Sequence, residues 1–195
     1  MTNEVNIGTG NASGMFYHAP LTPTAPTMPT SPFDTMTGFT EVGFVGEDGP
    51  SWTPYGSVEQ IKAWSLATVR NIKTEKGTIT VPVISTTAES LKTVFGADAV
   101  TETAANATHG NIVTVETEYG PYNKNEAFVL VGKDGDDGIM LSCASGIVTE
   151  ISEIGFAPGG AIIWSITITG DWTFVKDDGQ VVAATNTNTG STTTG

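Results

Sequence analysis

The chain has 195 residues, of which 21 are acidic and 8 are basic, giving a formal net charge of −13. This balance argues against wrapping nucleic acid, which needs clustered Lys and Arg, and against anionic membrane surfaces. The single cysteine, Cys143, excludes an intrachain disulfide, and one Cys with two distant His cannot form a structural zinc site. We expect one domain with no cofactor, no metal and no membrane span.

The first 35 residues predict a short strand followed by an extended arm. The apolar run 15–19 fits a first strand. Five prolines between positions 20 and 32 then favour extended, polyproline-like backbone. Leu21 and Met28 interrupt the polar composition and are able to dock on a surface. The arm therefore either lies along its own domain or reaches a neighbouring subunit, and the sequence leaves both open.

The next segment predicts strands on either side of one long loop. Three strands are expected, over residues 39–45, 58–70 and 72–84. Residues 46–57 contain three glycines and two prolines, which indicates a loop. Long loops inside compact domains are uncommon unless they bind something. Trp52 and Tyr55, which we place at its tip, are therefore interface candidates; the alternative is that Trp52 folds back on its own domain.

One helix is expected, over residues 87–95. Thr86 to Glu89 fits a capping box, in which a hydroxyl accepts from a backbone amide and the Glu reaches back. Four apolar side chains then share one helical face: Ala88, Leu91, Val94 and Phe95. Gly96 ends the helix, because glycine adopts positive φ without strain.

The second half predicts short strands between turns. After a polar loop at 97–110, strands are expected over 112–119, 127–131, 139–145, 147–154, 161–169 and 172–175, the last either separate or ending its predecessor. Residues 133–138 resemble part of a calcium loop, but Ser145 stands where an EF-hand has Glu, so we interpret them as a solvated hairpin turn. The spacing indicates an all-β sandwich or barrel.

The predicted organisation has three parts. Residues 1–35 form the N-terminal arm and first strand, residues 36–182 form the β domain, and residues 183–195 form a Thr/Gly-rich tail that we expect to be disordered. Cys143 lies in an apolar run, which favours a buried, inert thiol. No pair of acidic residues stands out as catalytic, so we expect no enzymatic activity.

The order of features resembles the major tail proteins of long-tailed, non-contractile bacteriophages, which are tail tube subunits. The features that carry the resemblance are Gly-Met-Phe-Tyr-His-Ala-Pro at 14–20 before a Pro/Thr-rich stretch, Phe-Thr-Glu-Val-Gly-Phe-Val-Gly-Glu-Asp-Gly at 39–49, Ile-Lys-Ala-Trp at 61–64, Thr-Glu-Lys at 74–76, and Leu-Lys-Thr-Val-Phe-Gly at 91–96. The match spans roughly residues 12–175. It rests on the ordered set of motifs.

The resemblance implies a mainly β tail tube fold, a β-sandwich or partial barrel with one short flanking helix. It also implies hexameric rings that stack into a tube, through which DNA passes without specific binding. Loops and the N-terminal arm would bridge successive rings. A tape measure protein and a tail terminator are the implied partners, and the implied location is the virion tail after synthesis in the host cytoplasm.

Six residues are our candidates for contacts between subunits: Phe16, Tyr17, Trp52, Tyr55, Lys73 and Lys76. The two lysines belong to a cationic group, residues 62–92, that holds five of the eight basic side chains and would pair with acidic patches on neighbours. One rival interpretation is a carbohydrate- or host-binding β-module with Trp52, Tyr55 and Trp64 as stacking residues. Another is a hydrolase with an unrecognised carboxylate pair.

Overall fold

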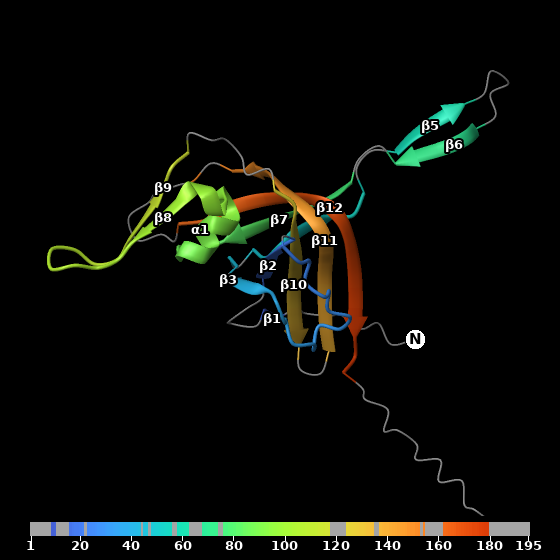
Figure 1. The fold of residues 1–195 in the computed structure, drawn as a ribbon. Helices are drawn as coiled ribbons and strands as arrows, with labels where there is room; N and C mark the ends of the chain where they lie inside the picture. The colour runs from blue at the N-terminus through green and yellow to red at the C-terminus, as the bar shows by residue number, and fades with distance from the viewer. Residues whose placement is uncertain are drawn as a thin grey trace, which may run out of the picture.

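The computed structural model describes residues 9–10, 16–21, 23–43, 45–46, 48–55, 58–62, 68–73, 76–117, 124–134, 137–152, 154 and 162–179. The predicted C-terminal tail and Trp64 lie outside the described residues. The described part is mainly β with one α-helix (Figure 1), so the predicted fold class is confirmed. None of its helices is long and apolar enough to cross a membrane.

An eight-stranded antiparallel sheet forms the body, in the order β3-β2-β10-β11-β12-β7-β4, with β1 also pairing with β10. The strands are β1 (Thr9–Gly10), β2 (Phe16–Pro20), β3 (Thr40–Gly43), β4 (Ser51–Thr53), β7 (Gly77–Val83), β10 (Glu126–Asp134), β11 (Asp137–Ile151) and β12 (Trp164–Asp177). The expected hairpin turn at 133–138 is confirmed, because Asp134 lies opposite Asp137.

The sheet curls toward closure at one end. Val45, just after β3, forms a β-bridge with Val83 of β7, which lies toward the opposite edge of the sheet. The Pro82 carbonyl accepts a hydrogen bond from the Gly46 N–H at 2.7 Å, so this carbonyl points away from β12. The Pro82 nitrogen, which has no hydrogen to donate, points the same way. The β7–β12 ladder therefore stays intact, and the result is a partial barrel.

Two apolar clusters cover the two faces of the central strands. Along β10, Phe128 and Leu130 belong to the main core with Phe16, whereas Val129 and Val131 belong to a smaller cluster with Met140 on the other face. Alternate side chains of a strand point to opposite faces. The strand is therefore buried on both sides, which explains its uninterrupted apolar sequence.

Helix α1 (Ala88–Phe95) packs beside one end of the curled sheet (Figure 1). The N-cap is Thr87, whose Oγ1 accepts from the Ser90 backbone N–H at 3.2 Å. Glu89 therefore sits one position too early to return to the cap, and it pairs with Lys92 instead, so the predicted capping box is wrong in that detail. Gly96 ends the helix with φ +94°, as expected.

The Pro-rich segment lies along its own domain. Met28, Met36 and Phe39 pack against the cluster of Val129, Val131 and Met140. The Ser31 hydroxyl donates to Asp177 Oδ2 at 2.5 Å, which ties the segment to the end of β12. Of the two arrangements that the sequence left open, the described residues 23–39 adopt the one that covers their own sheet.

The turn at residues 30–34 predicts an acid-dependent loosening of this segment. Hydrogen bonds from the Thr30 and Ser31 backbone N–H groups lower the pKa of Asp34 below its ordinary value of 3.8. A lowered pKa means that the stabilisation is present above pH 3.8 and disappears as the pH falls through the folded-state value. In unassembled protein, the Thr30 and Ser31 amide NMR signals should shift with a midpoint below 3.8, while the Thr24 amide serves as control. A midpoint at or above 3.8 would contradict the assignment.

The strand predictions need four corrections. Residues 46–57 are not all loop, because they contain β4, and the loop predicted at 97–110 contains β8 (Val100–Thr103). The strand predicted at 58–70 is divided between β5 (Val58–Lys62) and β6 (Thr68–Lys73), and β7 begins only at Gly77. The strands predicted at 139–154 are one strand, β11. Residues 172–175 end the preceding strand, β12, which is one of the two alternatives that the sequence left open.

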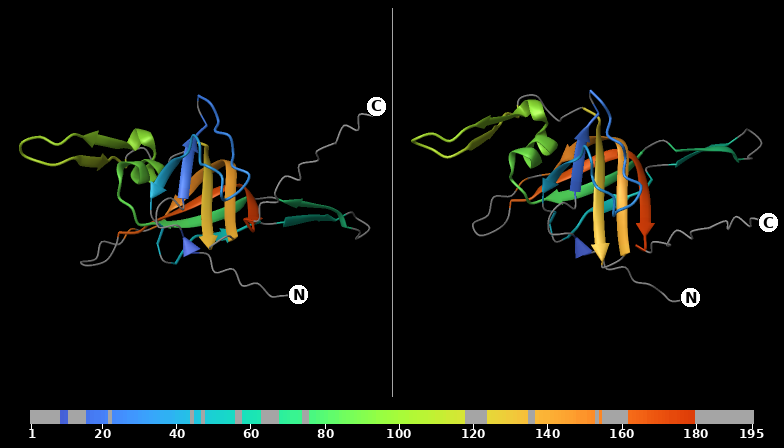
Figure 2. Two further views of the ribbon diagram at one scale, coloured as in Figure 1. Left: turned by 90° about the horizontal axis from the view of Figure 1, so that it is seen from below. Right: turned by 60° about the horizontal axis from the view of Figure 1, so that its bottom comes forward.

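Two hairpins project from opposite sides of the body (Figure 2). One pairs β5 with β6, and the other pairs β8 with β9 (Ile112–Val115) after a 3₁₀ turn, η1 (Ala97–Ala99). Both are two-stranded sheets separate from the main one. An isolated two-stranded hairpin is at best marginally stable in water, so contact with a further partner would stabilise each of them.

Candidate assembly surfaces

Phe16 is a core residue, which corrects its prediction as a contact between subunits. Its side chain is 0% exposed and stacks on Phe128 with ring centroids 6.0 Å apart. Strand β2 lies between β3 and β10, and its Phe16 side chain belongs to the main core. A side chain so placed cannot reach a second subunit without repacking the core.

Tyr17, the next residue, points to the other face and is half-buried. It packs beside the cluster of Val129, Val131 and Met140. Burial raises the pKa of its phenol, and the negative charge of the nearby Glu41 carboxylate raises it to a smaller extent. The aromatic ring therefore has a structural role within the subunit. Its proposed contact with a neighbour stays a prediction.

Trp52, Tyr55 and Phe174 are referred to below as the aromatic patch. Trp52 lies in the edge strand β4, is half-buried against the main core, and stacks on Phe174 at 6.1 Å between centroids. Phe174, on β12, is 51% exposed, and Tyr55 is 68% exposed. Trp52 thus folds back on its own domain while the other two rings present apolar surface to solvent. Phe174 was not predicted as an exposed residue, because the alternation of side chains along its strand does not reveal that this end of the core is accessible to solvent.

The structure shows an ion pair for Lys76 and a strand position for Lys73, the two lysines predicted to contact neighbours. Lys76 Nζ lies 3.1 Å from Asp171 Oδ2, and both side chains are more than half exposed. Such an exposed pair contributes about 0–1 kcal/mol and leaves both groups accessible to other charges. Lys73 is the last residue of β6, in the hairpin that projects from the body. Their role in contacts with neighbours stays a prediction.

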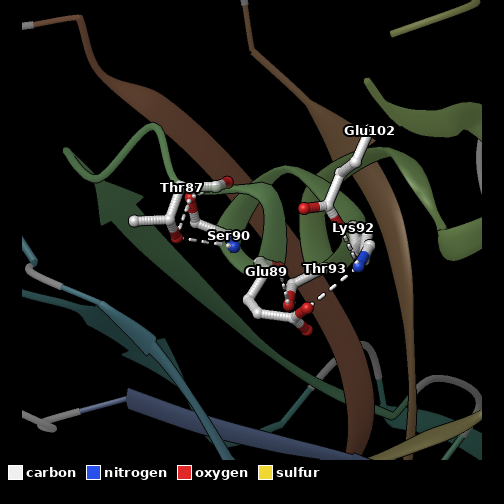
Figure 3. A network of polar contacts seen from close by, with 6 residues as sticks. All are labelled: Thr87, Glu89, Ser90, Lys92, Thr93 and Glu102. Atoms are coloured by element: carbon white, nitrogen blue, oxygen red, sulfur yellow. Dashed lines mark hydrogen bonds and ion pairs between the residues drawn. The ribbon is translucent and has the colours of Figure 1, made fainter. Parts of the chain in front are cut away.

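A small network ties the β8–β9 hairpin to the helix (Figure 3). Lys92 Nζ donates to Glu102 Oε1 at 2.7 Å and to Glu89 Oε1 at 2.9 Å. These two hydrogen bonds, with that to Glu102 contributing most, raise the pKa of Lys92. Val113, opposite Glu102, and Ile112, one position further from the helix, are 36% and 42% exposed. The hairpin therefore presents branched apolar side chains to solvent.

Hydroxyl side chains make up much of the outer face of β7, β11 and β12, beside Pro82, Ile147 and Glu150. The Thr80 hydroxyl bonds with that of Thr167 at 3.2 Å, and Thr149 bonds with Thr169 at 3.0 Å. We define the hydroxyl face as Thr78, Thr80, Thr149, Ser165, Thr167 and Thr169, which are all half-buried or exposed. Cross-strand threonine pairs stabilise a sheet without apolar cover. This face needs no packing partner to remain stable in water.

One ionisable pair is buried inside the domain. His18 Nδ1 lies 2.8 Å from Glu126 Oε2, and the two side chains are 9% and 8% exposed. The two residues come from neighbouring strands, β2 and β10, yet are 108 positions apart in sequence. The His18 Nε2 atom is also buried and has no hydrogen-bond partner among the described residues. A pair without solvent access serves the fold rather than a substrate.

Cys143 is buried, as predicted. Burial raises the pKa of its thiol, and two glycines, Gly146 and Gly170, leave the space that its sulfur fills. A protonated thiol with no open approach is unreactive. Within the part of the chain that the structure describes, no group of three His, Cys, Asp or Glu residues is placed to hold a metal ion.

The sequence of residues 2–185 matches the phage tail tube protein family. The chain belongs to this family. No curated protein matches the sequence. The match covers nearly the whole chain, so the resemblance inferred from the ordered motifs is confirmed.

Membership of the phage tail tube protein family gives the described surfaces their context. The chain is a structural component of the phage tail, and its copies assemble into a tube. The exposed aromatic patch, the projecting hairpins and the strand edges of β3 and β4 are therefore candidates for contacts between copies, and those contacts stay a prediction. Exposed strand edges pair readily with other chains.

Proposed function

We propose that this chain forms the tail tube of a long-tailed, non-contractile phage as stacked hexameric rings. The carrying observation is the curled sheet, whose terminal strands β3 and β4 stand at its two edges in the described chain. Joining such edges between identical copies removes the liability of exposed strands and closes a ring. Rings of identical subunits then stack into a tube.

We assign the hydroxyl face to the lumen of this tube. Its residues are threonine and serine, so it offers DNA phosphates no ammonium or guanidinium group to bind. The net charge of −13 adds a repulsive field. DNA would leave the capsid through such a channel without specific binding. A tape measure protein would occupy the channel before ejection, a terminator would cap it, and synthesis would take place in the host cytoplasm.

Electron microscopy of the purified protein tests the proposal. Rings or tubes about 100 Å across are expected, a width that follows from six domains of this size around a channel. Rotational averaging of end-on views should give six-fold symmetry. A protein that stays monomeric at high concentration and binds on a glycan array would instead favour the carbohydrate-binding module.

A further inference from the structure

The β8–β9 hairpin carries exposed apolar surface, because Ile112 and Val113 are 42% and 36% exposed. Thr103 pairs with Ile112 and Glu102 with Val113, so one exposed apolar side chain lies on each face of the ribbon. Its base is held by the buried Val100 and by Lys92, which bonds to Glu102. A ribbon of this kind is marginally stable on its own, and a partner that buries both side chains would stabilise it.

The aromatic patch has the complementary character and lies on the other side of the body. Tyr55 stands three residues before β5, so the patch is at the base of the projecting β5–β6 hairpin. Phe174 offers half of its ring surface, stacked on a tryptophan that the core holds in place. Rigid, partly exposed aromatic rings are typical anchors of protein interfaces.

The charges of the two regions are also complementary. The sequence of β5 and β6 contributes Lys62, Arg70 and Lys73 against one acidic residue, Glu59. Residues 97–116, from η1 to the residue after β9, contribute three acidic residues and no Lys or Arg. Within the subunit Asp98 pairs with Lys124 at 2.6 Å and Glu102 with Lys92 at 2.7 Å, but both carboxylates stay more than half exposed. Opposite charge around a contact speeds association and fixes its register.

We propose that the β8–β9 hairpin of one copy packs on the aromatic patch of the next copy, beneath its β5–β6 hairpin. The β8–β9 and β5–β6 hairpins lie on opposite sides of the body (Figure 2), so a two-fold dimer cannot bring each β8–β9 hairpin to the base of the other copy's β5–β6 hairpin. A head-to-tail contact satisfies both in every copy, and such a contact propagates into rings or tubes. This inference rests on the proposed function, because it names the contact through which the tube assembles.

Engineered cysteines test the contact in full-length protein. The Val113→Cys and Tyr55→Cys variants, each keeping the buried Cys143, are mixed, assembled and mildly oxidised. We expect disulfide-linked dimers from the mixture and none from either variant alone. The double variant should give a ladder of dimers, trimers and longer chains, which only a head-to-tail contact produces. Thr27→Cys, at an exposed position of the Pro-rich segment, replaces Val113→Cys in the control mixture and should give no cross-link.

The outcomes separate this contact from the wider proposal. Tubes in the microscope without cross-links between positions 55 and 113 would overturn the contact and leave the tube proposal standing. Absence of any assembly by the unmodified protein would overturn the tube proposal itself. Dimers from Val113→Cys alone would show a two-fold contact and overturn the head-to-tail arrangement. If the cysteines themselves block assembly while Thr27→Cys assembles and both variants remain folded by circular dichroism, that result also supports the contact.

Discussion

Alanine in place of Phe16 is expected to lower the free energy of unfolding by about 3–5 kcal/mol. The ring is fully buried, stacks on Phe128, and lies where β2 joins β3 to the central strands. Its removal leaves a cavity that a closely packed core cannot fill. Urea denaturation of unassembled protein measures the change, together with the loss of near-ultraviolet circular dichroism at lower urea.

Tyr55→Ala is the matched control, because the same kind of truncation there removes a side chain that is 68% exposed. Its stability should change by no more than about 0.5 kcal/mol, as is usual for surface substitutions. The Tyr55→Ala protein should therefore remain folded, but we expect it to be impaired in tube formation. Equal stability losses in the two variants would contradict the assignment of Phe16 to the core.

Removing one partner of the buried His18–Glu126 pair should destabilise the chain by about 3–5 kcal/mol, because the remaining polar group stays buried without its partner. Glu126→Leu leaves the His18 imidazole in this position, at a site where both side chains are less than a tenth exposed and His18 Nε2 has no partner among the described residues. The double variant His18→Leu/Glu126→Leu should recover most of the loss, since well-packed apolar residues often replace such pairs at no cost. Urea denaturation of all four proteins completes the cycle.

The exposed Lys76–Asp171 pair provides the reference cycle. Its two side chains are 55% and 70% exposed, so the coupling free energy should lie below about 1 kcal/mol. The buried pair should exceed that value clearly. Additive effects of His18→Leu and Glu126→Leu would show that the two side chains do not stabilise each other, despite the 2.8 Å separation of Nδ1 and Oε2.

Local chemistry predicted part of this structure well. The helix was found from its hydroxyl cap, its apolar face and Gly96, all of which act within a few residues. The β10–β11 hairpin was found from its Gly/Asp turn for the same reason. The division of this segment into β5 and β6 was not predicted, because residues 63–67 contain no glycine or proline, the residues that usually indicate a turn.

What the sequence concealed depends on distant partners. Ser51–Thr53 is a strand only because β7 lies beside it, and Val100–Thr103 only because β9 does. The same limit applies to the candidate sites. Tyr55 was rightly placed at an exposed position, but the burial of Phe16 and the exposure of Phe174 follow from where the curled sheet closes and where it stays open. No local pattern records that geometry.

The place of β12 in the sheet bears on how the chain is made in the cell. β12 is the last described strand to leave the ribosome, yet it lies between β11 and β7. Until residues 164–177 emerge, the described links between β7 and the β3-β2-β10-β11 half are those at Val45 and Gly46, which bridge to Val83 and bond to Pro82. Chains that stop before β12 therefore lack the strand that joins the two halves of the sheet through continuous ladders. They also lack Phe174, and with it part of the aromatic patch.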